Sequence, residues 1–363
     1  MIEKIIKGIK YRLNEENLTA AVTAKRNGYE GDIIIPETVV FKKVAYRVTC
    51  IGEEAFSWCS FLTSIVIPEN VTTIFSGAFE GCSSLTSIVV AEGNTVFDSR
   101  EQCNAIIYTA TNTLICGCQS TIIPDSVTNI KWAFKDCSSL TSIVIPESVK
   151  SIGEHAFEYC SSLTSIVIPD SVTSIEYDAF KNCSSLTSIV IPDSVTSIGD
   201  WAFRDCSSLT SIVIGNGVTS IGKYAFKGCS SLTSIVIPDS VTNIGDSVFK
   251  DCKRLSDIII PDSVTSIGES AFKYCFSLTS IVIPDGVTSI GKSAFWGCEF
   301  LTSIVIGNGV TNIGEKAFRG CKSLTSITFR GTMAQWNEIA LDETWKNKVP
   351  ATVVHCTDGD VEI

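Results

Sequence analysis

Cysteine is the residue type whose spacing in this chain could most readily support chemistry. Eleven of the sixteen cysteines share one position in a 23-residue pattern: Cys59, Cys82, Cys137, Cys160, Cys183, Cys206, Cys229, Cys252, Cys275, Cys298 and Cys321. A residue repeated in phase meets the same environment in every unit, and free cysteine packs as a small buried hydrophobe. We therefore expect a ladder of buried free thiols. Stacked strands lie about 4.8 Å apart, so distance alone leaves disulfides between neighbouring units open.

The remaining five cysteines lie outside this ladder. They are Cys50, Cys103, Cys116, Cys118 and Cys356. Cys103 together with Cys116-Gly-Cys118 could be taken for a metal site, but this spacing differs from the C-x-x-C of a zinc ribbon. The sequence therefore predicts no metal ligand and no cofactor-binding residue.

General-base chemistry has little support in this sequence. His155 and His355 are the only histidines, and they fall in different repeats. Serine and threonine hydroxyls are abundant, but they recur so uniformly that none is distinguished as a nucleophile. We predict no catalytic residue and expect that the protein is not an enzyme.

A carboxylate occurs at the same turn of many repeats. These residues are Glu69, Asp125, Glu147, Asp170, Asp193, Asp239, Asp262 and Asp285. Aspartate commonly caps turns through its own backbone, which favours a structural role. Calcium also prefers oxygen ligands, although no single repeat supplies six of them. A calcium-binding row thus stays open as the alternative.

The same local structure in each repeat must position these residues. The segment Leu140–Cys160 is an example. Ile143 and Ile145 alternate with exposed neighbours, which indicates a strand, and Pro146 ends that strand. Apolar residues then follow at offsets 0, 4, 5 and 8, as expected for one face of a short helix: Ile152, Ala156, Phe157 and Cys160. The strands should form one parallel sheet. Because helices are wider than strands, this sheet should lie on the concave side.

The pattern L-x-x-I-x-I-P followed by I-G-x-x-A-F-x-x-C resembles the BspA-like leucine-rich repeats, a 23-residue class common in bacterial surface proteins. The resemblance covers nearly the whole chain. It implies an α/β leucine-rich-repeat solenoid with a parallel concave β-sheet and short helices on the convex side. It also implies adhesion or protein binding at the cell surface or after secretion, with no catalytic residues to assign.

Three segments are expected along the chain. Residues 1–50 form an N-terminal cap with a first degenerate rung, residues 51–329 form the solenoid, and residues 330–363 form a C-terminal cap. Tyr11 and Leu13 should lie in a strand that covers one end of the core. Trp336, Ile339, Leu341 and Trp345 suggest a helical cap at the other end, followed by an extended tail from Val353. We expect about 13 rungs, spaced as in a β-sheet.

The period breaks at about 92–129. Cys82 and Cys137 are 55 residues apart, which is two periods plus nine, and one residue is missing at Ile130-Lys-Trp-Ala133. Two apolar runs, 104–108 and 112–116, predict a β-hairpin. This insert could recognise a partner or could only bend or staple the solenoid.

The net charge and the hydropathy of the chain exclude some classes of partner. A net charge of −11 argues against nucleic-acid binding. No apolar run reaches the roughly 18 residues of a membrane helix, so membrane insertion is not expected. The start, MIEKIIKGIKYRL, lacks the apolar region of a signal peptide. The compartment is thus left open, and a monomer is expected.

The predicted partner-binding surface comprises exposed columns of the strands and two residues of the insert. The partner is a protein or a glycan, and a spacer without a ligand is the alternative. The residues are Arg100 and Tyr108, then Thr141, Ser142 and Val144, Thr164, Ser165 and Val167, and Thr187, Ser188 and Val190. On the helical side we expect acid–base pairs four residues apart: Asp200/Arg204, Asp246/Lys250, Glu269/Lys273 and Glu315/Arg319.

Overall fold

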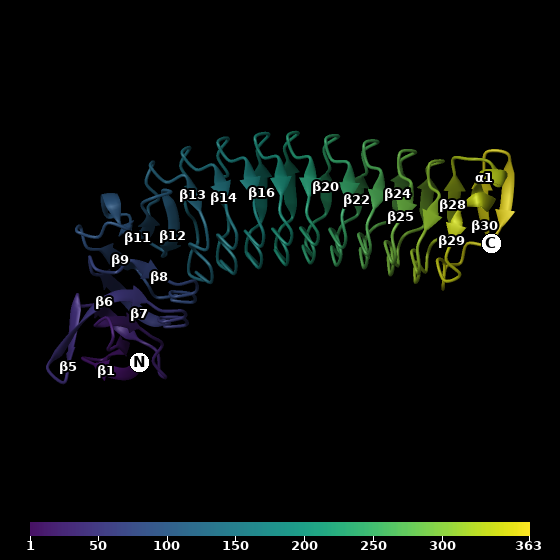
Figure 1. Cartoon of the computed structure of the whole chain (residues 1–363). Helices are drawn as coiled ribbons and strands as arrows, with labels where there is room; N and C mark the ends of the chain where they lie inside the picture. Colours follow the sequence, from purple (N-terminus) through teal and green to yellow (C-terminus); the bar gives the residue numbers. More distant parts are fainter. The chain divides into compact units, whose positions relative to one another are not determined.

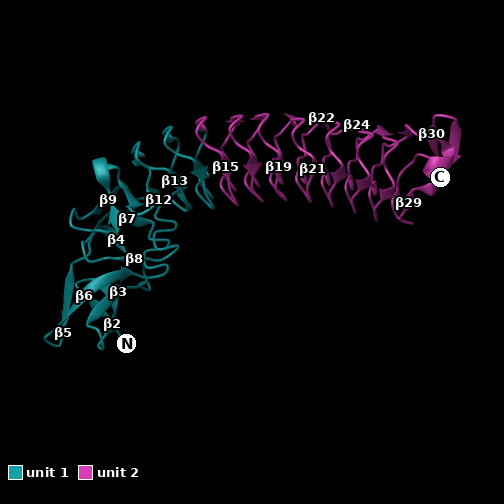
Figure 2. Cartoon of the chain, turned by 45° about the horizontal axis from the view of Figure 1, so that its top comes forward, with its two compact units in different colours: residues 1–166 teal, residues 167–363 magenta.

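The computed structural model describes residues 1–363 and consists of two compact units, residues 1–166 and 167–363 (Figure 2). Its repeats form about 13 turns of a β-solenoid, as the period predicted. The division between the units falls inside the segment predicted as continuous solenoid. None of its helices has the length and apolar character needed to cross a lipid bilayer.

Each regular coil of unit 2 contains two strands and two turn regions. In one coil, β16 (Ser188–Ile191) buries Ile189 and Ile191 and exposes Val190. Pro192 then leaves the strand, and β17 (Ser197–Ile198) returns the chain to the core. Pairing with the next coil is parallel and keeps the 23-residue register, with Ser188 opposite Ser211 and Ser197 opposite Ser220. The repeat therefore builds two parallel ladders.

The ladders of unit 2 extend through strands that Figure 1 shows as a row of coils. The longer strands are β16, β18 (Ser211–Ile214), β20 (Ser234–Val236), β22 (Asp257–Ile259), β24 (Ser280–Ile283), β26 (Ser303–Ile306) and β28 (Ser326–Phe329). The two-residue strands are β15 (Ser174–Ile175), β17, β19 (Ser220–Ile221), β21 (Asn243–Ile244), β23 (Ser266–Ile267), β25 (Ser289–Ile290) and β27 (Asn312–Ile313).

The predicted short helices on the convex side are wrong. These segments are turns, as Trp201 and Asp205 show, because both have left-handed backbones with φ of 63° and 58°. A helix needs bonds from each N–H to the carbonyl four residues earlier. Here the Phe203 N–H donates to the Ala225 carbonyl of the next coil at 2.8 Å, and the Asp205 N–H donates to the Lys227 carbonyl at 2.7 Å. The turn side is thus a third coil-to-coil connection, and the helix width from which concavity was inferred is absent.

The core of unit 2 is a stack of identical side chains. Phe203 is fully buried, and its ring centroid lies 5.2 Å from that of Phe180 and 5.6 Å from that of Phe226. The thiols lie beside this stack, and Cys206 Sγ donates to the Phe180 carbonyl at 3.1 Å. All sixteen cysteines are free thiols, and the predicted burial of the ladder is confirmed apart from Cys137, which is partly exposed. Burial raises the pKa of Cys206 far above its ordinary value.

Unit 1 begins with a mixed sheet, which is antiparallel except for two parallel pairs. Its strands are β1 (Ile2–Ile6), β2 (Ile9–Asn14), β3 (Thr19–Val22), β5 (Thr38–Phe41) and β6 (Val44–Ile51), with β8 (Thr73–Ile74) beside β6. Strand β2 contains Tyr11 and Leu13, both fully buried, so the strand predicted there is confirmed. A parallel sheet follows, made of β4 (Glu30–Ile34), β7 (Phe61–Ile67) and β9 (Ser87–Val90).

The insert forms the predicted hairpin. Strands β11 (Ala105–Tyr108) and β12 (Thr113–Gly117) pair antiparallel, and β10 (Phe97–Asp98) pairs with β11. Strand β12 continues in parallel into β13 (Asn129–Ile130) and then β14 (Ser151–Ile152). A short 3-10 helix, η1 (Arg100–Gln102), lies between β10 and β11. The hairpin thus extends the ladder of two-residue strands within unit 1.

The C-terminal end is only partly helical. Helix α1 (Met333–Glu338) starts at a capping box between Thr332 and Gln335 and contains Trp336, whereas the other three residues predicted for a helical cap lie outside it. Leu341 belongs to β29 (Ala340–Leu341), and Trp345 lies in a turn. The predicted tail is a hairpin of β30 (Val353–Cys356) and β31 (Gly359–Glu362).

Candidate functional site

The strand face is the surface formed by the outward side chains of the longer strands. In unit 2 the valine and isoleucine column of this face is an apolar row with these exposed fractions: Val190 60%, Val213 59%, Val236 69%, Ile259 70% and Val282 46%. Val167, at the equivalent position of the preceding coil but outside any strand, is 79% exposed. Successive side chains of the row lie side by side, because Val190 pairs with Val213 in the parallel register. Its side chains are exposed because their strand neighbours Ile189 and Ile191 occupy the core side.

Hydroxyl columns flank this row. Thr187 and Ser188 are both exposed in unit 2. The Thr210 hydroxyl donates to the Thr187 carbonyl at 3.0 Å, and the Thr302 hydroxyl donates to the Thr279 carbonyl at 2.9 Å. The threonine column thus contributes to coil-to-coil hydrogen bonding, while the valine row offers apolar surface. The outward columns of threonine, serine and valine are uncharged except at Asp257, where aspartate replaces serine.

Unit 1 carries the predicted residues of two repeats in the same orientation. Thr141, Ser142 and Val144 are exposed, and Val144 has 82% of its surface accessible. Thr164 and Ser165 are exposed as well. The sequence pattern therefore identified outward-facing side chains in both units.

Arg100, predicted as a partner-binding residue, forms its hydrogen bonds within the insert. Its Nε and Nη2 donate to the Asp98 carboxylate at 2.9 and 2.6 Å, and its Nη1 donates to Asn112 at 3.1 Å and to Ser126 at 3.3 Å. The bonds to Asp98 raise the pKa of Arg100. The guanidinium thereby connects β10, the hairpin loop and the turn that follows the hairpin.

Tyr108 lies at the end of β11, opposite Phe97 of β10. The two ring centroids are 6.0 Å apart, and 37% of Tyr108 is exposed. The insert thus brings Tyr108 close to the Arg100 segment. Arg100 lies in η1 and Tyr108 in β11, whereas Thr141–Val144 lie in an extended segment before Pro146 to which no strand is assigned, so the strand predicted there is not formed.

The turn side carries ion pairs, but not the predicted ones. Pairs four residues apart required a helix, and the turns replace it. Bridges instead join equivalent positions of neighbouring coils: Lys223 Nζ lies 2.9 Å from Asp246, and Lys292 Nζ lies 2.6 Å from Glu315. Both pairs are substantially exposed, so each contributes little to stability.

Aromatic residues on this side cover one another. The rings of Trp201 and Tyr224 are 4.6 Å apart, and the Arg204 guanidinium lies 4.2 Å above Trp201. These aromatic side chains are thus partly packed against those of the neighbouring coil.

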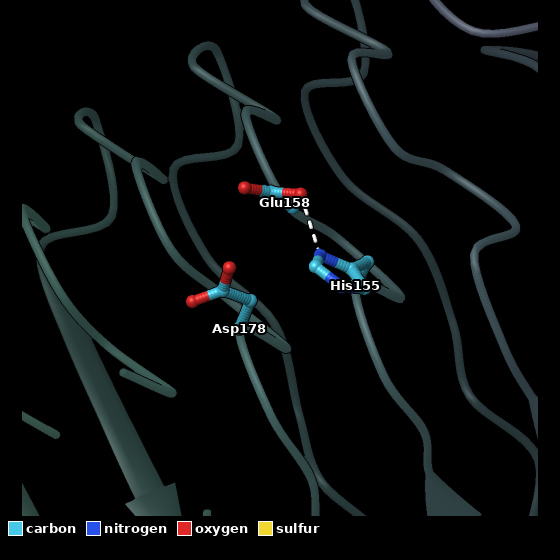
Figure 3. A group of neighbouring side chains, drawn as sticks. All are labelled: His155, Glu158 and Asp178. Carbon is cyan, nitrogen blue, oxygen red and sulfur yellow. Dashed lines mark hydrogen bonds and ion pairs between the residues drawn. The ribbon is translucent and has the colours of Figure 1, made fainter. Parts of the chain in front are cut away.

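Both histidines contact a carboxylate. In unit 1, His155 Nδ1 lies 2.7 Å from Glu158 (Figure 3), and near the C-terminus His355 Nδ1 lies 2.9 Å from Asp360.

Two of the turn carboxylates accept a hydrogen bond from a backbone N–H of the next coil, at turns where that coil has Gly-Asn in place of Pro-Asp. Asp193 accepts from the Asn216 N–H at 2.7 Å, and Asp285 accepts from the Asn308 N–H at 3.2 Å.

Sequence reasoning missed a cavity of about 240 Å³ within unit 1. It lies between the turn at 74–80 and the turn at 131–137, and the end of β12 forms part of its wall. Two features of the sequence pointed to this region: the interrupted period and the missing residue beside Trp132. Neither feature showed whether the hairpin would fill the space between the two turns.

Comparison with known protein families identifies the type of repeat. The model of the BspA type leucine rich repeat region matches in six copies, over residues 38–107, 105–233 and 219–348. A comparison with curated proteins found no match.

Solved structures share this architecture. A leucine rich cell surface protein from Faecalibacterium prausnitzii is 32% identical, with 94% of this chain and 98% of that chain covered and a TM-score of 0.56. The pneumococcal vaccine antigen PcpA has a TM-score of 0.59 at 20% identity, with 95% of this chain and 90% of that chain covered, and shows the fold alone. The repeat pattern, the parallel ladders and the family match agree. The chain belongs to the BspA-type leucine-rich repeat family.

Proposed function

We propose that this protein is a non-catalytic binding module whose strand face engages an extended protein or glycan partner. The observation that carries this proposal is the exposed apolar row of unit 2, in which Val190 and Val236 leave 60% and 69% of their surface accessible. Contiguous exposed apolar surface marks interaction sites in soluble proteins. The relative from Faecalibacterium is described as a cell surface protein, which agrees with a role in adhesion.

The absence of catalysis is part of this proposal. The hydroxyls of the strand face recur in equivalent surroundings, and the threonines hydrogen-bond to the preceding coil, as Thr210 does to Thr187. His155 contacts Glu158 on the turn side, and His355, which lies beside Thr328 at the C-terminal end of the strand face, contacts Asp360. A spacer without a ligand is the alternative function, and it would need no apolar row on its surface.

The test separates these two functions. The chain is screened against a glycan array and against surface proteins, and the hit is measured with the triple variant Val190→Thr, Val213→Thr, Val236→Thr. Threonine keeps the shape and the β-propensity of valine but removes its apolar surface. Affinity for the hit should fall at least about tenfold, which corresponds to about 1.4 kcal/mol. The melting temperature should stay close to that of the wild type.

A matched control carries Thr196→Ser, Thr219→Ser and Thr242→Ser, each directly before a two-residue strand, and it should bind as the wild type does. Equal affinity of the valine variant and the wild type would exclude the strand face. The absence of any hit would support the spacer.

The insert contributes to recognition in the same proposal. Tyr108 is the residue to test, because Arg100 is committed to contacts within the chain. Tyr108→Ala should weaken the partner's affinity without changing the melting curve, since the ring is partly exposed. An unchanged affinity would leave the insert with a structural role only.

A further inference from the structure

The phenylalanine stack of unit 1 is interrupted at Phe79. Its ring lies 5.3 Å from Phe56 on one side, as in the regular coils. The coil that would supply the next phenylalanine is replaced by the hairpin, which has no such turn. Phe79 is consequently half-buried, whereas Phe56 and Phe203 are fully buried, and Phe79 lines the cavity.

The hairpin covers the other end of the interruption. A Cβ atom on Gly117 would clash with the Phe134 ring, so the backbone at the end of β12 lies directly against that ring. Phe134 is fully buried and stacks on Phe157 at 5.2 Å. The strand end thus replaces a ring for Phe134 but leaves the space beside Phe79 unfilled.

This space suits an aromatic ring. Its wall includes the apolar side chains of Ile74, Ala78, Ile115 and Ala133, with Phe79 at one side. The charged residues Glu80, Lys131 and Lys135 also line it. The cavity measures about 240 Å³. A dry apolar cavity of about 150 Å³ is enough to bind benzene. An entering ring could occupy the position that the next phenylalanine holds in a regular coil.

Two backbone donors lie beside this position. In a regular coil, the N–H groups of Trp201 and Phe203 donate to carbonyls of the next coil at 2.9 and 2.8 Å. Gly77 and Phe79 occupy the equivalent positions of the interrupted coil and line the cavity. No protein carbonyl accepts a hydrogen bond from either N–H. An acceptor oxygen on the ligand would satisfy these donors.

We propose that this cavity binds an aromatic ring carrying a nearby carbonyl or carboxylate oxygen. The ring stacks on Phe79, and the oxygen accepts from the N–H groups of Gly77 and Phe79. Both a free aromatic acid and a phenylalanine residue of a peptide have this chemistry. The proposal is independent of the strand face, because none of the residues that line the cavity lies on that face.

The experiment titrates the whole chain by calorimetry with three ligands: 3-phenylpropionate, N-acetyl-phenylalaninamide and 3-cyclohexylpropionate. At least one of the two aromatic ligands should bind one to one with a dissociation constant of about 1 mM or tighter. The cyclohexyl acid should bind more weakly, since it cannot stack in the same way. The better aromatic ligand identifies the source, free acid or peptide. Failure of both to bind at about 10 mM would overturn the proposal.

Variants that fill the cavity test whether the ligand binds there. Ala78→Leu fills the cavity, so the aromatic ligand should bind at least about tenfold more weakly while the melting temperature is kept or raised. Ala133→Leu fills it from the other side and serves if the first variant fails to fold. Thr265→Ser, directly before β23 in unit 2, is the matched control and should bind as the wild type does. Unchanged affinity in a folded filled variant would show that the ligand binds elsewhere.

Discussion

The coil around Phe203 and the coil around Phe79 have the same pattern but different neighbours. Phe203 has a ring on each side and is fully buried. Phe79 has one ring neighbour, lines a cavity and is half-buried. A solenoid coil therefore gains its stability from both adjacent coils, and interrupting the repeat exchanges stability for an accessible surface.

The two arginines of these regions show the same contrast. Arg100 donates to Asp98, Asn112 and Ser126, and so holds together a segment that the repeat does not specify. Arg204 lies on a regular coil, with its guanidinium 4.2 Å from the Trp201 ring and its Nε 3.0 Å from the adjacent Asp205 carboxylate. Arg100 thus connects three separate segments, whereas the polar contact of Arg204 stays within its own turn.

The largest expected effect comes from the stack itself. Phe203→Ala should lower the free energy of unfolding by about 3–5 kcal/mol, because a fully buried ring is lost on both interfaces. Phe79→Ala should cost only about 1–2 kcal/mol, since its ring is half-buried beside a cavity. Chemical denaturation of both variants measures the difference. Equal midpoints for Phe203→Ala and the wild type would refute the stack as the source of stability.

An intermediate effect is expected at the insert. Arg100→Ala should lower the free energy of unfolding by about 1–3 kcal/mol, because a half-buried Asp98 carboxylate loses its charged donor. The matched variant Arg204→Ala should cost about 1 kcal/mol or less. Thermal melting of the two variants provides the comparison. A larger loss in Arg204→Ala than in Arg100→Ala would reverse our interpretation of the two regions.

The smallest effect concerns the thiols and depends on pH. Burial raises the folded-state pKa of Cys206, so the unfolded chain loses this proton first as pH rises. The stability linked to this thiol is complete below its unfolded pKa near 9 and is lost progressively above that value. At pH 10 the loss amounts to about 1.4 kcal/mol for one thiol.

Cys206→Ala isolates this contribution. Its destabilisation relative to the wild type should shrink by about 1.4 kcal/mol between pH 7 and pH 10, as measured by chemical denaturation. Cys356→Ala, at a partly exposed position, should show a smaller change and serves as the control. A pH-independent difference for Cys206→Ala would mean that its thiol is not buried in solution.

The sequence alone determined the solenoid, its core and its outward columns. A strict period forces equivalent positions into one environment, so Phe203 and Cys206 are buried and Val190 is exposed for the same reason in every coil. The hairpin was predictable too, because two apolar runs around a polar turn leave few other local structures.

The conformation of the turn side was decided only by the tertiary structure. The offsets of Ala202, Phe203 and Cys206 suit a helix, but neighbouring coils offer carbonyls to the same N–H groups that a helix would use. Left-handed backbones at Trp201 and Asp205 direct those groups outward from the coil to the next one. Periodicity within one repeat cannot reveal this competition, because the partner carbonyl lies 22 residues away in another coil.

The cavity beside Phe79 also depended on tertiary packing. The sequence showed that the period breaks, and the hairpin showed where the chain goes. Only the folded structure shows that Gly117 covers Phe134 and leaves Phe79 uncovered. The reason is geometric: a two-stranded hairpin adds a rung to the strand ladder but supplies no turn to the phenylalanine stack.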